Sequence, residues 1–418
     1  MKKQSANFAQ GAPVPAPPVP GRAAGSAPLA EDLAEQAPDA AGPKPREAAA
    51  HILSGPVHRG VLRVALPSVA TMLLQSTNSF LDRFFVGSLG PDALAAVTVS
   101  SSLMFALMAA AMAISVGTTA LVARSVGEGQ EEQAERATQQ SLLLSAAVAV
   151  VVALPMWVLR RPLLSILGLQ TETMGLAVAY LNLLLLGLPF LFTMLILNGA
   201  FRGLGDTTRP FWVSLGANIV HAVGNWLLIF GNLGFPRLGL PGGALALAIS
   251  QAVSLLLYLY FLSRSPLRGA LGRRGWGVDL DWSWRIARIG LPASAQQLIR
   301  VGSMLAFQGI LARTAAGSAA VAAFGVGLVS ESIAFMPGFG YSIAASAFVG
   351  QNLGARQVKR ANAGAWAATW QALLVMSVMG VVFWTFAEPF ARLFLHASEA
   401  APGQQEEIAR TIALTVAY

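Results

Sequence analysis

Charged side chains are scarce in this sequence. They make up 11% of its 418 residues, and hydrophobic side chains make up 55%. Soluble domains carry roughly 25% charged residues. This composition excludes an ordinary soluble domain, and we therefore interpret the chain as a protein of the lipid bilayer.

Cysteine is absent, which excludes disulfide frameworks, zinc–thiolate sites and thiol nucleophiles. The four histidines, His51, His58, His221 and His396, are too scattered to predict a metal cluster. The formal net charge of +8 does not indicate a nucleic-acid partner, because the basic residues fall in short segments between apolar runs instead of forming a stripe. We expect no cofactor, no metal and no nucleic acid.

Residues 1–56 differ from the rest of the sequence. They are rich in proline and alanine and show no apolar periodicity, which predicts a disordered tail. No continuous apolar segment follows Lys2 and Lys3, so we predict no cleaved signal peptide.

Long apolar runs follow one another from residue 61 onward. A helix needs about 20 apolar residues to cross the hydrocarbon core. We expect spans at 61–86, 93–123, 137–159, 176–200, 210–233, 238–262, 289–313, 318–346 and 361–387, and the start of another near 408. The predicted fold class is an all-α polytopic membrane protein.

The connections between the spans differ in basic charge. Thirteen Arg and Lys residues fall in one set of alternate connections and five in the other. Cytoplasmic loops hold the excess of Lys and Arg, so the richer set and the N-terminus are predicted to be cytoplasmic. The richer set is Arg124, Arg136, Arg202, Arg209, Arg264, Arg268, Arg273, Arg274, Arg285, Arg288, Arg356, Lys359 and Arg360.

Two short segments recur along the chain. "RVALP" at 63–67 matches "RIGLP" at 288–292, and "ALVARSVGEGQ" at 120–130 matches "AFVGQNLGARQ" at 347–357. These matches predict two repeated six-helix lobes, with residues 57–262 as the first lobe, 263–286 as a cytoplasmic linker and 287–418 as the second lobe. The shift of 225 residues would end the second lobe near 487. We therefore expect the second lobe to be incomplete in this sequence.

Several longer stretches resemble one family. "STNSFLDRFFVGSLG", "LNGAFRGLGDTTRP", "NWLLIFGNLGFPRLGLPGGALA" and "ESIAFMPGFGYSIAASAFVGQNLGAR" look like the multidrug and toxic compound extrusion (MATE) transporters. The resemblance covers nearly everything from residue 54 onward. It implies a twelve-helix fold of two lobes facing a central cavity, which exchanges protons or sodium for organic cations and other drugs.

Asp82 lies near the outer end of the first span. Charged groups in a bilayer are costly and are treated as functional hypotheses by default. Resemblance places Asp82 at the acidic position of the family's first-helix motif, where a carboxylate is linked to protonation or cation binding. The alternative is that Asp82 is solvated at the outer surface with Arg83 and only ends the helix.

Arg300 and Glu331 are a second pair of charges, predicted at comparable depth on adjacent antiparallel spans. We expect them to pair, because either alone would be an uncompensated buried charge. Glu331 is then a switchable acid that releases Arg300 when protonated, or the two form a structural ion pair. In one branch of the family, an acid would fall at the position of Arg300. The permanent positive charge of Arg300 makes sodium binding there unfavourable, which favours protons as the coupling ion.

In the other branch, an acid would fall at Asn225. Asn225 and His221 are four residues apart and share a helix face. His221 is a candidate proton carrier, with a hydrogen-bonded packing role as the alternative. Gln75, at the repeat equivalent of Arg300, and Asn78 are further candidates for the cavity, although most such polar groups join helices.

The resemblance implies a secondary active antiporter that exports organic cations or drugs by alternating access, and the residue observations are compatible with it. The coupling ion is H⁺ or Na⁺, the partners are small, cationic organic molecules and the lipid bilayer, and the chain is expected to be monomeric in a bacterial-type inner membrane. The first alternative is a flippase for lipid-linked oligosaccharides, which would need basic groups like Arg300 in its cavity. A membrane-embedded enzyme or a channel is less compatible with so few charged groups.

Overall fold

A computed structural model describes residues 51–166, 171–272, 276–313, 317–389 and 413 of the chain. Inside some helices the side chains of individual residues also lie outside the described part, Arg83 and Glu331 among them. The described ranges contain long α-helices, two short 3₁₀ turns and no strand. The all-α fold predicted from the sequence is confirmed.

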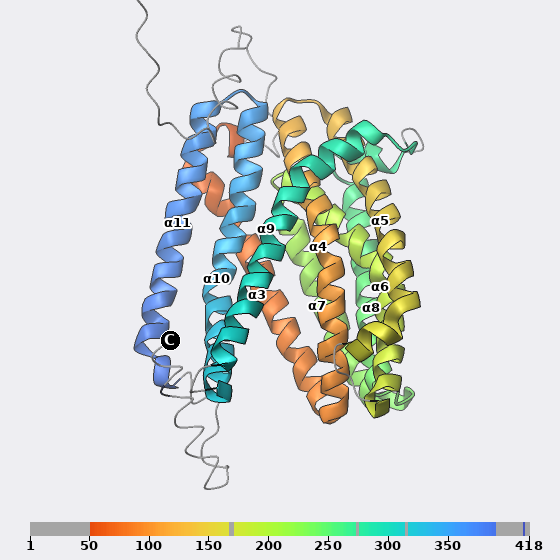
Figure 1. Ribbon diagram of the computed structural model, residues 1–418. Helices are drawn as coiled ribbons and strands as arrows, with labels where there is room; N and C mark the ends of the chain where they lie inside the picture. The colour runs from red at the N-terminus through yellow and green to blue at the C-terminus, as the bar shows by residue number, and fades with distance from the viewer. Residues whose placement is uncertain (1–50, 167–170, 273–275, 314–316, 390–412, 414–418) are drawn as a thin grey trace, which may run out of the picture. The chain divides into compact units, whose positions relative to one another are not determined.

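The helices correspond one by one to the predicted spans (Figure 1). They are α3 (Val57–Gly87), α4 (Pro91–Gly127), α5 (Glu131–Ile166), α6 (Thr171–Gly203), α7 (Thr208–Phe230), α8 (Leu240–Ser263), α9 (Leu280–Ala312), α10 (Gly317–Gly354) and α11 (Val358–Thr385), with the 3₁₀ turns η1 (Asn232–Gly234) and η2 (Arg268–Leu271). Seven described segments are long and apolar enough to cross a membrane. The further span predicted near residue 408 lies outside the described residues.

Helices α9 and α10 are longer than predicted. α9 begins nine residues before the predicted start at 289, inside the predicted linker, and α10 continues eight residues past the predicted end at 346. Arg300 is therefore 20 residues from the start of α9, or about 30 Å at the helical rise, instead of the 16 Å expected from the apolar run. Apolar runs mark the lipid-facing part of a helix, and these helices continue with polar turns beyond it.

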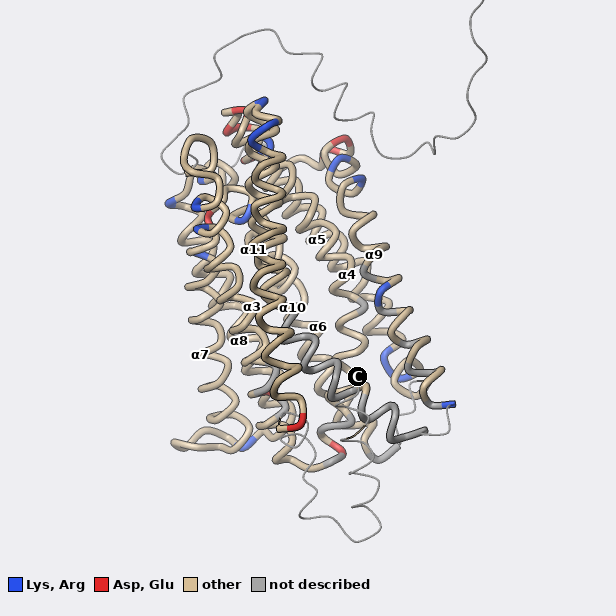
Figure 2. The backbone as a smooth tube through the Cα atoms, turned by 90° about the vertical axis from the view of Figure 1, so that its left-hand side faces the viewer, with Lys and Arg blue, Asp and Glu red and all other residues tan. Residues whose placement is uncertain are grey.

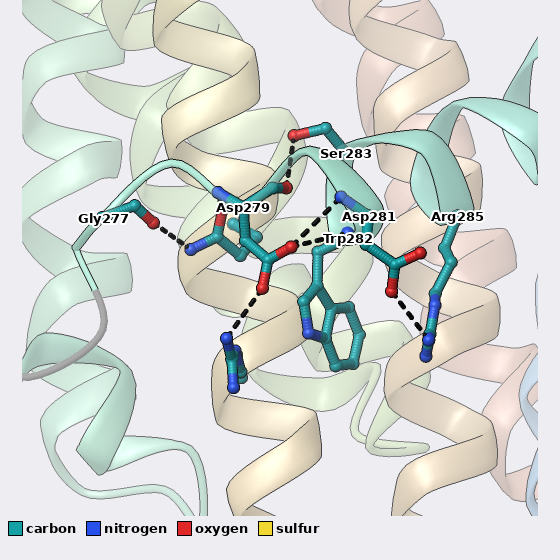
Figure 3. A network of polar contacts seen from close by, with 8 residues as sticks. Gly277, Asp279, Asp281, Trp282, Ser283 and Arg285 are labelled. Carbon is teal, nitrogen blue, oxygen red and sulfur yellow. Dashed lines mark hydrogen bonds and ion pairs between the residues drawn. The ribbon is translucent and has the colours of Figure 1, made fainter.

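A polar clamp fixes the start of α9 (Figure 3). The carboxylate of Asp279 caps the helix by accepting from the backbone N–H groups of Asp281 (3.1 Å) and Trp282 (3.3 Å). It also pairs with Nη2 of Arg136 on α5 at 2.7 Å. Gln140 of α5 donates to the carbonyl of Gly277 (2.7 Å) and accepts from the N–H of Asp279 (3.0 Å). These contacts, here called the α5–α9 clamp, explain why α9 starts where it does.

Two glycines allow the backbones of α9 and α4 to lie in close contact where the helices cross. A Cβ on Gly117 of α4 would overlap the carbonyl of Ile286, and one on Gly290 of α9 would overlap the carbonyl of Ala113. Ser294 of α9 adds a hydrogen bond to the carbonyl of Ala109 at 2.9 Å. Because lipid is as apolar as leucine, close backbone contact of this kind is what holds membrane helices together.

Buried apolar side chains form three clusters. Two of them join α4, α5, α6 and α8, and one of these also takes in Trp282 and Ile286 at the start of α9. The third joins α3 to α10 and α11, and includes Val61, Val64, Ala344 and Phe348. The first predicted lobe therefore touches the second through α3 as well as through α4.

The third cluster also contains Ile52 and Leu53, which are 0% and 7% exposed. Residues 51–53 are helical, and α3 follows at Val57. The prediction of a disordered tail up to residue 56 was therefore wrong for its last six residues. Two apolar side chains in an otherwise unpatterned segment are enough to pack here, because α10 and α11 provide the surface.

Basic residues collect at one end of the helices, as the blue segments in Figure 2 show. This end, here called the Arg-rich end, carries Arg124 and Glu128 at the end of α4, Arg209 at the start of α7 and Arg360 at the start of α11. A direct contact joins α10 to α6 at this end. Nε2 of Gln351 on α10 donates to the carbonyl of Gly203 on α6 at 2.9 Å.

Candidate functional site

Helices α3 and α7 lie side by side and run in the same direction. Thr207 donates to the carbonyl of Val64, and further along Asn218 donates to the carbonyl of Leu74. The partners are 143 and 144 residues apart in the two cases. Because the separation in sequence between contacting residues is nearly constant, the residue numbers increase in the same direction along both helices. The two helices are therefore parallel.

The same separation brings the rare polar residues of the two helices together. Asn78 lies opposite His221, and Asp82 lies opposite Asn225, each pair 143 residues apart. On each helix the two residues are four apart and so occupy one face. We call this row, from Leu74 and Asn218 to Asp82 and Asn225, the α3–α7 ladder.

The inner contacts of the ladder converge on the carboxylate of Asp82. Oδ1 of Asp82 accepts from Nδ2 of Asn225 at 3.1 Å and lies 3.3 Å from Nε2 of His221. Nδ1 of His221 lies 3.0 Å from Oδ1 of Asn78. The side chain of His221 is 3% exposed and that of Asp82 is 35% exposed, so the imidazole is buried and the carboxylate is partly exposed.

The geometry specifies where hydrogens can be. Because Asn78 presents its carbonyl oxygen, Nδ1 of His221 carries a hydrogen and donates it. The contact between Nε2 of His221 and Oδ1 of Asp82 is then favourable only if one proton lies between them. That proton makes either an imidazolium beside a carboxylate or a neutral imidazole beside a carboxylic acid. Without it, the lone pairs of Nε2 and Oδ1 face each other, and Nε2 can instead accept from Nδ2 of Asn225, which lies 3.3 Å away. The contact therefore offers a place for one proton.

Asn225 is buried, with 2% exposure, and its two amide atoms have different surroundings. Nδ2 donates to Asp82, whereas Oδ1 has no hydrogen-bond partner. Oδ1 lies 3.7 Å from where a Cβ on Gly243 of α8 would be, so it faces a helix that presents no side chain at that point. Within the described part of the chain, a buried acceptor without a hydrogen-bond partner therefore lies beside the contact between Asp82 and His221.

The other predicted site residues lie elsewhere. Gln75 neighbours the ladder on α3 with an exposed side chain. Arg300, on α9, is exposed and places its guanidinium 5.6 Å from the ring centre of Phe339 on α10. The predicted ion pair with Glu331 is not tested, because the side chain of Glu331 lies outside the described part. Its role and those of the other site residues stay predictions.

Sequence reasoning missed two parts of the ladder. It singled out Asp82, Asn78, His221 and Asn225 and placed the last two on one helix face, but it did not pair them with Asn78 and Asp82. It also overlooked Asn218, whose position three residues before His221 puts it on the same face of α7. The spacing was a usable signal on each helix, whereas nothing in one sequence says that α3 and α7 are neighbours.

Comparison with known proteins agrees with the fold. The family model described as MatE matches residues 67–227 and 292–418. A FAD transporter of Shewanella oneidensis is 30% identical over 356 residues, which cover 82% of this chain and 75% of that protein. A probable multidrug resistance protein NorM of Thermotoga maritima is 28% identical over 343 residues, covering 81% and 72%.

Solved structures give the same result. A crystal structure of MATE in complex with MaL6 superposes with a TM-score of 0.80 at 25% identity, covering 88% of this chain and 80% of that one. An outward-facing conformation of a multidrug resistance MATE family transporter of the MOP superfamily superposes with a TM-score of 0.80 at 26% identity, covering 89% and 81%. Both match the described helices over most of their length.

Proposed function

This chain belongs to the MatE family, whose members are membrane transporters and not enzymes, and from that premise we propose that it is a proton-coupled exporter of small organic molecules. Multidrug resistance proteins among its relatives support the substrate class. The predicted alternatives of a membrane enzyme or a channel are set aside, because the family match covers both halves of the chain.

The contact between Asp82 and His221 is the observation that carries the proposal. Oδ1 and Nε2 lie 3.3 Å apart, a distance at which they can share one proton, and both α3 and α7 contain segments long and apolar enough to cross a membrane. Uptake of that proton lets Asp82 and His221 bond to each other across the two helices. After its loss, Nε2 of His221 accepts from Nδ2 of Asn225 on its own helix, 3.3 Å away. The two protonation states therefore favour different separations of α3 and α7, which is how a proton can bias two conformations of a transporter.

Sodium fits this site less well. Hard cations prefer several oxygen ligands, and here one face of the Asp82 carboxylate is occupied by an imidazole nitrogen and an amide nitrogen. The oxygen of Asn78 is engaged by His221. Asn225 supplies a neutral amide where an acid would provide a second negative charge. The ligands available around Asp82 therefore favour a proton over sodium.

The Arg-rich end is proposed to face the cytoplasm, following the excess of basic residues in its connections. Asp82 is five residues from the opposite end of α3, or about 8 Å at the helical rise. In this orientation the carboxylate, which is 35% exposed, lies nearer to the outer surface than to the cytoplasm. Protons entering down the membrane gradient would meet it first.

A flux assay in proteoliposomes tests the proposal. Purified protein is reconstituted with imposed proton gradients, sodium gradients or neither, and efflux of a fluorescent organic cation is followed. We expect transport with the proton gradient and none above background with sodium alone. Transport driven by sodium at a clamped pH would reject the proton proposal.

A second candidate substrate class is an aromatic anion such as a flavin nucleotide. Arg300 favours it, since its guanidinium is exposed on α9 and lies 5.6 Å from the Phe339 ring centre, an arrangement that offers both a positive charge and a flat surface. The relative from Shewanella oneidensis is named a FAD transporter. The flippase alternative rests on the same arginine.

Competition separates the two substrate classes. If Arg300 binds an anion, FAD should slow efflux of the reporter dye, and Arg300→Ala should remove this inhibition while Arg313→Ala, at the end of the same helix, should not. If only cations are substrates, there are two possible results. Either FAD does not slow efflux at all, or it slows efflux equally in the original protein and in Arg300→Ala.

A further inference from the structure

Residues 51–55, here called the entry segment, precede α3 and are packed into the Arg-rich end. Ile52 is 0% exposed and Leu53 is 7% exposed, whereas Ser54 is exposed. In Figure 1 the red start of the described chain lies beside the neighbouring ends of α10 and α11. A segment outside the apolar spans has thus become part of the core.

Polar side chains of α10 and α11 hold the backbone of the entry segment. Arg360 of α11 donates from Nε to the carbonyl of Ile52 at 2.9 Å and from Nη2 to the carbonyl of Gly55. Asn352 of α10 donates to the same Ile52 carbonyl at 3.4 Å. The guanidinium of Arg360 also lies 5.5 Å from the ring centre of Phe348. The forked guanidinium of Arg360 therefore binds two backbone carbonyls of the entry segment, those of Ile52 and Gly55.

The other side of the entry segment faces the first predicted lobe. Cδ1 of Ile52 occupies the place where a Cβ on Gly205, in the turn between α6 and α7, would be. Gly205 has a φ of +76°, a left-handed conformation that favours glycine. Gln351 of α10 binds the carbonyl of Gly203 in the same turn at 2.9 Å. The segment therefore fills the junction of α3, the α6–α7 turn, α10 and α11.

This position conflicts with opening at the Arg-rich end. The segment is continuous with α3, and the N–H of Gly60 donates to the carbonyl of Pro56 at 2.9 Å. Its hydrogen bonds, however, come from α10 and α11. If the α6–α7 turn separates from α10, the segment cannot keep Ile52 against Gly205 and its carbonyls on Arg360 together.

We propose that the entry segment is an intracellular plug, which docks on α10 and α11 when the Arg-rich end is closed and undocks when that end opens. The proposal rests on the alternating access of the proposed function. Arg360 is its positioning residue, because its two donors hold both carbonyls. Docking of the plug then helps to set the balance between the two conformations of the transporter.

The absence of cysteine makes the plug directly measurable, because an introduced thiol is the only one in the chain. Ile52→Cys places it at the buried position and Ser54→Cys, two residues on, at an exposed one. Inside-out vesicles are treated with a membrane-impermeant thiol reagent, and the labelling rate is measured. We expect Ile52→Cys to react at least tenfold more slowly than Ser54→Cys at rest. During turnover with substrate and a proton gradient, we expect its rate to approach that of the control.

Arg360→Ala tests the docking without any need for transport. Loss of a hydrogen bond from a charged donor corresponds to about tenfold or more in an opening equilibrium, so Ile52→Cys should label about tenfold faster in this background. Lys359→Ala, which removes an exposed neighbouring cation, should change nothing. Arg360→Lys, with one charged group in place of the fork, should be intermediate. Helical circular dichroism and size-exclusion profiles verify that each variant is folded.

Two results would overturn the plug. If Ile52→Cys labels as fast as Ser54→Cys at rest, the segment is not docked. If it stays equally protected at rest, during turnover and in Arg360→Ala, the segment is a fixed part of the core. The labelling of Ile52→Cys in Arg360→Ala does not require transport. It can therefore be interpreted even if proton-driven flux is not observed, and the proposed function and the plug can fail separately.

Discussion

The α3–α7 ladder and the α5–α9 clamp are both polar clusters centred on an aspartate, but they are made of different partners. Asp82 faces an imidazole and one neutral amide, whereas Asp279 faces an arginine and two backbone N–H groups. An arginine stays charged at any physiological pH, and an imidazole does not. The clamp therefore suits a carboxylate that always keeps its charge, and the ladder suits one that exchanges a proton.

Their surroundings reinforce this difference. Asp279 lies outside the apolar spans, where the N–H of Trp282 and then Arg136 lower the pKa of its carboxyl below the usual value. Asp82 lies within five residues of the end of a membrane-spanning helix, and its histidine partner is 3% exposed. The same residue type is thus a helix cap in one place and a candidate ion-coupling group in the other.

The largest expected effect separates the two aspartates directly. Asp82→Asn keeps the shape of the side chain but removes the acid, so the contact with His221 can no longer exchange a proton. We expect proton-driven efflux to fall to background in the proteoliposome assay. Asp92→Asn, at the exposed start of α4, is the matched control and should transport normally. Unchanged efflux in Asp82→Asn would remove this residue from the mechanism.

Replacement of the imidazole should have a smaller effect. His221→Gln can still bond to Asn78 but cannot take up a proton, so Asp82 loses the group with which it shares one. We expect about tenfold slower transport, comparable to the loss of one hydrogen bond to a charged group, and a changed dependence of rate on pH. If the pH profile of His221→Gln coincides with that of the original protein, His221 is only a packing group.

Asn225→Asp adds a negative charge to the α3–α7 ladder, whereas Asp82→Asn removes one. It sets a second carboxylate beside Asp82, so that two negative charges share one site and favour a bound cation. We expect the variant to gain stimulation of efflux by sodium, which the original protein should lack. Asn218→Asp, about two turns before Asn225 on α7, controls for added charge elsewhere on the helix. No sodium response in Asn225→Asp would mean that the missing acid does not determine the choice of ion.

The smallest effect is expected at the clamp. Asp279→Asn weakens the cap of α9 and its pair with Arg136, and should lower the melting temperature slightly without altering the pH dependence of transport. Because the pKa of Asp279 is lowered in the folded protein, its contribution to stability is present above the ordinary aspartate pKa and is lost as pH falls below about 3.9. Melting curves at pH 3 to 7 should show the two proteins converging only at the acid end.

The sequence predicted the helices well, because each span needs a long apolar run. It also located Asp82, since a carboxylate in such a run is expensive. The partnership of Asp82 with His221 was beyond reach, because α3 and α7 are far apart in the chain and apolar patterning does not identify neighbours. The early start of α9 and the burial of Ile52 were missed for a related reason. Both depend on contacts between distant segments, such as Asp279 with Arg136 and the carbonyl of Ile52 with Arg360.

The parallel course of α3 and α7 has an electrostatic consequence. The two helices end at Gly87 and Phe230, five residues beyond Asp82 and Asn225 respectively. Their backbone dipoles therefore point their negative ends to the same side, and each adds roughly a few tenths of a kcal/mol in favour of a nearby positive charge. An arriving proton is thus attracted by the main chain of both helices as well as by the carboxylate, whatever substrate is carried out.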